Sequence, residues 1–151
     1  MIGLHSTTQP ITKLVCPLDA STVAESALTR AVELARALGA DVELLHVYQL
    51  SAFKIPKEDE TLDYIENLKG EAQTYLNDVR ARLVDAGLRV STCLIEGDPA
   101  HAIVEHGKAT PGCMLVMSTH GRTGIRRLVL GSVAEHVVRE ANVPVLTVHL
   151  D

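Results

Sequence analysis

The chain has 151 residues with a formal net charge of −5, and it contains one Phe, three Tyr and no Trp. The acidic balance and the shortage of aromatic stacking platforms argue against a nucleic-acid partner. No apolar run is long enough to cross a bilayer and residues 1–10 lack a signal-peptide pattern, so we expect a cytoplasmic protein without membrane contact. The length favours a single domain over residues 1–151.

Hydrophobic periodicity and turn residues divide the chain into alternating strands and helices. In chain order we predict a strand at residues 11–18, a helix at 22–38, a strand at 41–48, a helix at 58–86, a strand at 88–95, a helix from 98 to about 110, a strand at 114–117, a helix at 132–141 and a strand at 143–150. Residues 49–57 have no clear period and are predicted to form a loop. Strands that alternate with helices indicate an open, mostly parallel sheet with helices on both faces.

Local signals mark the ends of several helices. Two Ser/Thr-x-x-Glu pairs have the spacing of a capping box: Thr22 with Glu25, and Ser132 with Glu135. Asp98 followed by Pro99 predicts an N-cap with Pro at the first helical position. Gly70 lies inside the longest predicted helix, where it costs about 1 kcal/mol relative to Ala, and a break is allowed there.

Cysteine and histidine give no sign of a metal centre. Cys16, Cys93 and Cys113 are widely spaced and lie in or beside apolar runs, which predicts buried, reduced thiols. The seven His residues form no close cluster with them in the sequence, so we predict no metal ligands from the protein.

The segment between the fourth strand and the last helix is rich in glycine and free of acid. Residues 106–134 contain no Asp or Glu but hold Lys108, Arg122, Arg126 and Arg127. Glycines let a backbone approach a ligand, and a helix N-terminus offers unpaired N–H groups to a phosphate. The alternative is a set of ordinary turns before a self-capped helix, with solvated basic side chains. Neither a Walker lysine motif nor a G-x-G-x-x-G fingerprint is present.

The strand order decides whether this segment meets a carboxylate. In an open sheet of order 3-2-1-4-5, the order reverses between the first and fourth strands, and ligands bind beyond their carboxyl ends. These strands end at Asp19 and at Thr119-His120-Gly121. We prefer this order to 2-1-3-4-5 because it brings the carboxylate and the glycine loop to one cleft.

Motifs along nearly the whole chain resemble, in the right order, those of the universal stress protein family. They are Val15-Cys16-Pro17-Leu18-Asp19-Ala20-Ser21, Leu44-Leu45-His46-Val47, Gly97-Asp98-Pro99, Ser118-x-x-Gly121-x9-Gly131-Ser132 and Val143-Pro144-Val145-Leu146-Thr147-Val148. The resemblance implies a Rossmann-like five-stranded α/β domain that binds ATP, with Mg²⁺ or Mn²⁺ on the phosphates. It also implies a homodimer joined through the last strand, from Val143 to His149.

The resemblance implies a set of nucleotide-binding residues and no catalytic residue. The set is Pro17, Asp19, Val47, Met117, Ser118, His120, Gly121, Arg122, Gly131, Ser132 and Val133. In it, Asp19 would contact adenine beside the backbone of Val47. The phosphates would lie against Gly121, Gly131 and Ser132, with Ser118 near the ribose or α-phosphate.

Two departures from the family pattern bear on function. Ser118 replaces the first glycine of the phosphate motif, and Ala20 replaces the glycine after Asp19, where a positive φ would be costly. Three functions stay open: a nucleotide-binding regulatory protein of the stress response, an interaction module that does not bind nucleotide, and a slow ATP hydrolase. For the hydrolase, Asp19 or His120 would be the only candidate general bases.

Overall fold

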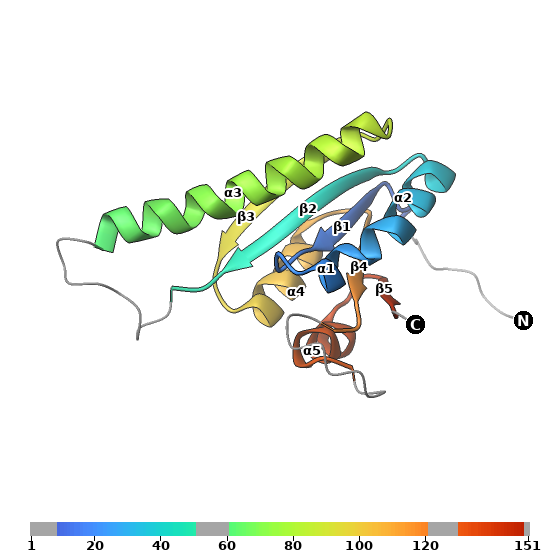
Figure 1. Cartoon of the computed structure of the whole chain (residues 1–151). Helices are drawn as coiled ribbons and strands as arrows, with labels where there is room; N and C mark the ends of the chain where they lie inside the picture. Colours follow the sequence, from blue (N-terminus) through green and yellow to red (C-terminus); the bar gives the residue numbers. More distant parts are fainter. Residues whose placement is uncertain (1–8, 51–60, 121–129, 150–151) are drawn as a thin grey trace, which may run out of the picture.

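The computed structural model describes residues 9–50, 61–120 and 130–149. Its elements in chain order are β1 (Lys13–Pro17), α1 (Thr22–Glu25), α2 (Ala27–Leu38), β2 (Asp41–Tyr48), α3 (Thr61–Asp85), β3 (Val90–Glu96), α4 (Pro99–Ala109), β4 (Cys113–Ser118), α5 (Ser132–Glu140) and β5 (Val145–Val148). The strands form one parallel sheet of order β3-β2-β1-β4-β5 (Figure 1). The predicted order and the Rossmann-like architecture are confirmed.

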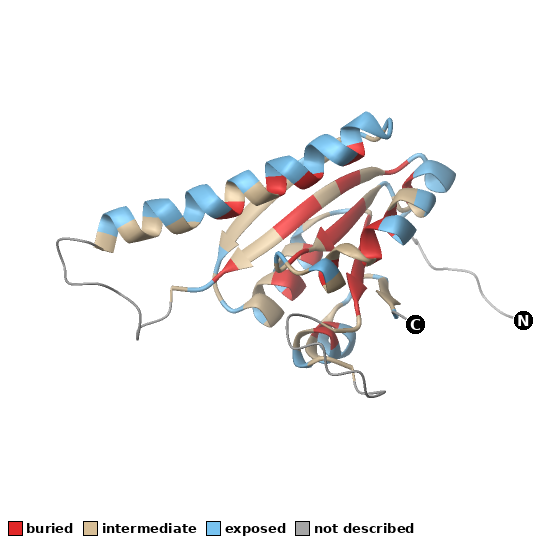
Figure 2. Cartoon of the chain, in the orientation of Figure 1, coloured by how far each residue is buried: buried red, intermediate tan, exposed pale blue. Residues whose placement is uncertain are grey.

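Helices cover both faces of the sheet, as the near-continuous apolar strands predict. One core cluster joins α2 and α3 to one face through residues that include Leu44 and Leu76. The second joins α4 and α5 to the other face through residues that include Leu45 and Val137. Because neighbouring residues of a strand point to opposite faces, Leu44 and Leu45 are both fully buried, one in each cluster. Figure 2 shows this burial concentrated in the sheet.

The helix predicted at residues 22–38 is instead two helices that meet at Ser26. The Ser26 hydroxyl donates to the Val23 carbonyl at 2.5 Å, and the Ser26 N–H turns back to Thr22 and Val23. Such local bonds compete with the helical pattern and end α1 after one turn. The capping box predicted for Thr22 and Glu25 is also wrong, because the N-cap residue of α1 is Ser21, whose side chain accepts from the Ala24 N–H.

Other predicted boundaries differ at their ends. The capping pair at α4 is confirmed, because the Asp98 side chain accepts from the His101 N–H and Pro99 opens the helix. Within the described residues β1 begins at Lys13 and β5 spans only Val145–Val148. Residues 51–57 of the predicted loop lie outside the described residues.

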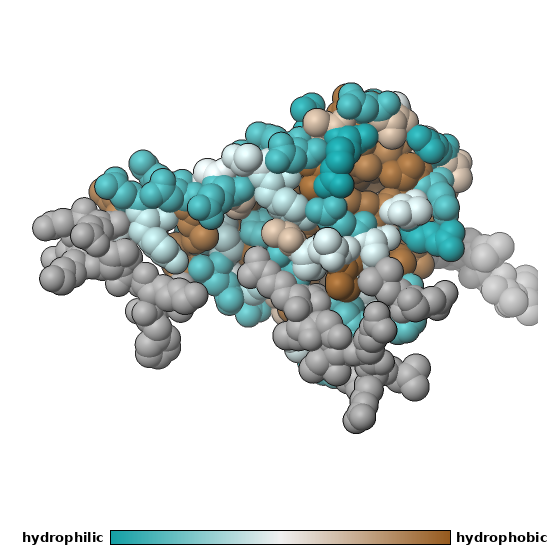
Figure 3. Space-filling view, in the orientation of Figure 1, coloured by the Kyte–Doolittle hydropathy of each residue, from teal (hydrophilic) through white to brown (hydrophobic). Residues whose placement is uncertain are grey.

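The long helix α3 runs unbroken through Gly70 for 25 residues. Its C-terminal half is held on the sheet by the buried side chains of Leu76, Val79 and Leu83, which offset the cost of one exposed glycine. Hydrophilic side chains line much of its outer surface (Figure 3). No helix in the described part of the chain is both long and apolar enough to cross a membrane.

The three cysteines are free thiols, as predicted. Cys16 and Cys113 are buried, but Cys93, on the edge strand β3, is only half-buried, which corrects the prediction for that residue. Burial raises the pKa of Cys16 to about 12, and it also raises the pKa of Cys93 and Cys113. Raised thiol pKa values make these side chains poor nucleophiles.

Ala20 has a φ of +65°, the one positive φ of a non-glycine residue in the described chain. A side chain in this conformation costs about 1–2 kcal/mol, whereas glycine adds roughly 0.4–1 kcal/mol of unfolded-state entropy. Ala20→Gly is therefore expected to raise the free energy of unfolding by about 0.5–1 kcal/mol. Urea denaturation with an unchanged m-value is the measurement, and a less stable variant would show that the turn is not strained.

Candidate functional site

The strand order reverses between β1 and β4. From β1 the chain crosses to β2 on one side, and from β4 it crosses to β5 on the other. The two strands are parallel neighbours, with Val15 opposite Leu115. Their carboxyl ends, Pro17 and Ser118, therefore lie at the same edge of the sheet. This is the place where open α/β sheets bind ligands.

Asp19 follows β1 and organises the turn into α1. Its Oδ1 accepts hydrogen bonds from the backbone N–H of Ser21 at 3.0 Å and from the Ser21 hydroxyl at 2.5 Å. The Ser21 oxygen accepts in turn from the Ala24 N–H at 3.0 Å. Asp19 therefore positions the N-cap residue Ser21 and is not itself the cap of α1. A contact with a base would come in addition to this positioning.

The N-terminus of α5 has no side-chain cap. Gly131 is the N-cap residue, in an extended conformation, and no side chain among the described residues caps the first turn. The capping box predicted for Ser132 and Glu135 is wrong, because Ser132 is the first helical residue and lies too far along to cap. The Glu135 N–H donates instead to the Gly131 carbonyl at 2.8 Å. Among the described residues, the N–H groups that begin α5 therefore have no side-chain cap, which suits an anion.

Thr119 connects this helix start to the end of β5. The Thr119 N–H donates to the Val148 carbonyl at 3.0 Å, and the Thr119 carbonyl accepts from the Gly131 N–H at 2.7 Å. The Thr119 hydroxyl lies 3.0 Å from Nδ1 of His120 and 3.1 Å from Nδ1 of His149. Thr119 thus contacts the residue after it, the end of β5 and the N-cap of α5. No sequence signal marks this role, which depends on contacts far along the chain.

Ser118 and His120 flank Thr119 and face inward. Ser118 is only 8% exposed, and its hydroxyl donates to the His120 carbonyl at 2.6 Å. The rings of His120 and His149 lie 5.8 Å apart. Nε2 of His120 is buried and has no hydrogen-bond partner among the described residues.

The remaining residues predicted for the site lie around these strand ends or outside the described chain. Met117 is buried in the cluster that α4 and α5 form with the sheet and that Val47 and Val133 border. Pro17, the last residue of β1, is half-buried. Gly121 and Arg122 fall outside the described residues.

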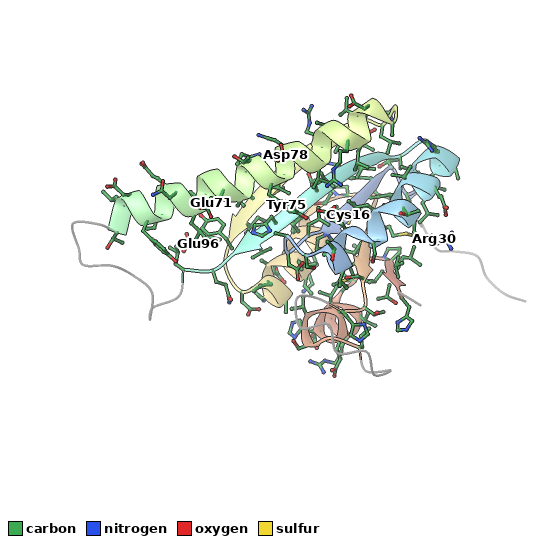
Figure 4. All side chains as sticks on the ribbon, viewed as in Figure 1. Cys16, Arg30, Glu71, Tyr75, Asp78 and Glu96 are labelled. Atoms are coloured by element: carbon green, nitrogen blue, oxygen red, sulfur yellow. The ribbon has the colours of Figure 1, made fainter. Side chains whose placement is uncertain are left out.

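An open groove of about 560 Å³ runs along α3. It is lined by Glu66, Asn67, Gly70, Glu71, Thr74, Tyr75 and Asp78. Figure 4 shows Glu71, Tyr75 and Asp78 along the helix. Burial first, and then the nearby Glu25 carboxylate, raise the pKa of Tyr75, so the ring stays neutral. Three carboxylates and no cation in its lining make the groove unsuitable for a phosphate.

A model of the universal stress protein family matches residues 10–149. Universal stress protein MJ0531 of Methanocaldococcus jannaschii is 37% identical over 137 residues, which cover 90% of this chain and 81% of that protein. The solved structure of MJ0577 has a TM-score of 0.80 at 30% identity, over 93% of this chain and 97% of its own. The chain belongs to the universal stress protein family.

More distant solved structures share the fold. A universal stress protein in complex with cAMP is 24% identical with a TM-score of 0.66, over 93% of this chain and 98% of its own. A family protein from Arabidopsis thaliana with AMP bound is 19% identical with a TM-score of 0.66, over 93% of this chain and 92% of its own. At these identities the likeness concerns the fold.

Proposed function

We propose that the protein binds an adenine nucleotide, in the form of ATP with Mg²⁺ or Mn²⁺ on its phosphates, and acts as a nucleotide-linked regulatory protein of the stress response. The observation that carries the proposal is the N-terminus of α5, which no described side chain caps and which is bonded to Thr119, directly after β4 at the reversal of strand order. Two proteins of the same fold hold cAMP or AMP, which agrees with an adenine nucleotide as the ligand class.

The proposed contacts follow from the places of the residues. The phosphates would lie on the N–H groups at Ser132 and Val133, with Gly121 and Arg122 supplied by the preceding segment. Asp19 and the backbone of Val47 would contact the adenine at the ends of β1 and β2. The metal would be held by the phosphates, because no group of three His, Cys, Asp or Glu in the described chain could hold it.

Titration calorimetry with Mg-ATP tests the proposal. The expected result is saturable binding with a Kd below about 100 μM, roughly −5.5 kcal/mol, and no saturable heat with adenosine, which lacks the phosphates. Absence of binding to Mg-ATP would remove the proposal.

A fold-sharing interaction module without nucleotide is the second candidate, and Ser118 favours it. The glycine of the family motif is replaced by a side chain whose hydroxyl is committed to the His120 carbonyl. Mass spectrometry of nucleotides released by heat from freshly purified protein separates the two candidates. Co-purified adenine nucleotide supports the first, and protein without nucleotide supports the second.

Catalysis is a minor part of the proposal. Hydrolysis of ATP would depend on Asp19 or His120, and the Oδ1 of Asp19 already serves the Ser21 cap. We therefore expect turnover no faster than about one per minute, far below the 1–10³ per second typical of enzymes.

The proposed assembly is a homodimer through the last strand. β5 is an edge strand of the sheet, and its residues Val145–Val148 are only half-buried in the single chain. An apolar edge is a place where a second chain can add.

A further inference from the structure

The hydroxyl of Thr119 lies between two imidazoles. It is 3.0 Å from Nδ1 of His120 and 3.1 Å from Nδ1 of His149, at the end of β5. A hydroxyl carries one proton and can accept through its lone pairs. At most one of the two rings can therefore accept from Thr119, and the other must donate to it. When one ring accepts and the other donates, the two bonds run in one direction, and that direction fixes where each neutral ring carries its proton.

We infer that Thr119 and His149 are positioning residues that set His120 to donate to a phosphate oxygen. In this direction, Nδ1–H of His149 donates to Thr119, and the Thr119 hydroxyl donates to Nδ1 of His120. The proton of the neutral His120 ring is then on Nε2. The opposite direction would leave a lone pair on Nε2 and would repel an anion.

Two observations favour this direction. Nε2 of His120 is buried and has no partner among the described residues, so a proton there calls for an acceptor that a ligand can supply. In the single chain His149 is exposed, and water can satisfy its Nε2 as either donor or acceptor. The surroundings of His120 therefore decide the direction of the two hydrogen bonds.

The backbone of Thr119 adds to this role. Its N–H bonds the end of β5 and its carbonyl bonds the N-cap of α5, so one residue holds the imidazole and the helix start in a fixed relation. The inference rests on the proposed function, because the phosphate is that of the proposed nucleotide. It adds Thr119 and His149 to the residues on which affinity depends.

Two variants with matched controls test the nucleotide contact. Thr119→Val keeps the shape and the backbone bonds but removes the hydroxyl, and we expect its affinity for Mg-ATP to fall about 10- to 100-fold, the range for a lost hydrogen bond to a charged group. Thr119→Ser is expected to restore affinity to within about threefold. His149→Ala is expected to weaken binding, whereas His101→Ala, at another exposed histidine, is expected to leave it unchanged.

The ring protons give a readout that needs no nucleotide. In ¹⁵N-histidine NMR at about pH 8, where an unperturbed imidazole is neutral, we expect His149 to carry its proton on Nδ1 and His120 on Nε2. This difference should disappear in Thr119→Val and return in Thr119→Ser. The same tautomer on both rings of the wild type, or a difference that survives in Thr119→Val, would overturn the inference.

The two proposals can fail separately. If the wild-type protein carries its protons on Nδ1 of His149 and Nε2 of His120 but does not bind Mg-ATP, the proposed function and the phosphate contact are contradicted. The directed hydrogen bonds through Thr119 are then still supported. Wild-type protein that binds Mg-ATP with an affinity unchanged by Thr119→Val and His149→Ala contradicts the positioning role alone.

Discussion

Ser132→Asp is expected to abolish measurable nucleotide binding without destabilising the protein. The new carboxylate would lie at the start of α5, where it interacts favourably with the helix dipole by about 0.3–1 kcal/mol. A bound phosphate at the same N–H groups would meet a like charge. At about 4–5 Å and an effective dielectric constant of 20, one such pair costs roughly 3–4 kcal/mol, or two to three orders of magnitude in Kd.

Ser132→Asn is the matched control, because it has nearly the shape of the Asp variant without the charge. We expect its Kd for Mg-ATP to stay within about tenfold of the wild type. Calorimetry supplies both Kd values, and thermal unfolding without nucleotide supplies the stability. Equal affinities for the Asp and Asn variants would show that no phosphate lies near this helix start. Glu135 is paired with Arg139 and is present in all three proteins.

Leu44→Ala and Leu45→Ala are each expected to lower the free energy of unfolding by about 2–5 kcal/mol, the range for deletion of a fully buried leucine side chain. The two residues are neighbours on β2 and are both fully buried, with Leu44 under α2 and α3 and Leu45 under α4. In a sheet covered on one face only, one of the two variants would be nearly neutral. Equal large losses therefore test whether both layers of helices are packed.

Leu62→Ala is the control, because Leu62 is 74% exposed at the start of α3. A change within about 0.5 kcal/mol is expected there. Urea midpoints at constant m-value give the three differences. A small loss for Leu45→Ala beside a large one for Leu44→Ala would contradict the packing of α4 on the sheet.

The strand order could be predicted because it depends on features written into the chain. Five apolar runs separated by helical patterns leave few parallel topologies, and the residues at two strand ends selected one of them. The cap of α4 could also be predicted, because Asp98 and Pro99 act locally and have no adjacent competitor. These are cases in which local preference and tertiary structure agree.

The caps of α1 and α5 could not be read from spacing. Ser21 and Thr22 are both able to cap, and the bonds from Ser21 to Asp19 decide between them. At α5, the bond from the Gly131 N–H to Thr119 fixes the glycine as the N-cap and makes Ser132 the first helical residue. Both outcomes depend on partners outside the motif. The second one changes a self-capped helix into a candidate anion site.

The role of Thr119 could not be predicted for the same reason. Its hydroxyl meets a ring at residue 149, and its backbone meets residues 131 and 148. The only local trace is its place between Ser118 and His120, two residues that the family resemblance already implied. Because Thr119 acts by positioning other residues, no sequence motif marks it.

Amide NMR during a titration with Mg-ATP tests the central claim most directly, because the claim concerns the N–H groups that begin α5. The amide signals of Ser132, Val133 and Ala134 are predicted to move together and to saturate with the calorimetric Kd, whereas adenosine without phosphates should leave them in place. Saturable binding that moves only amides of α3, with these three unchanged, would contradict the account.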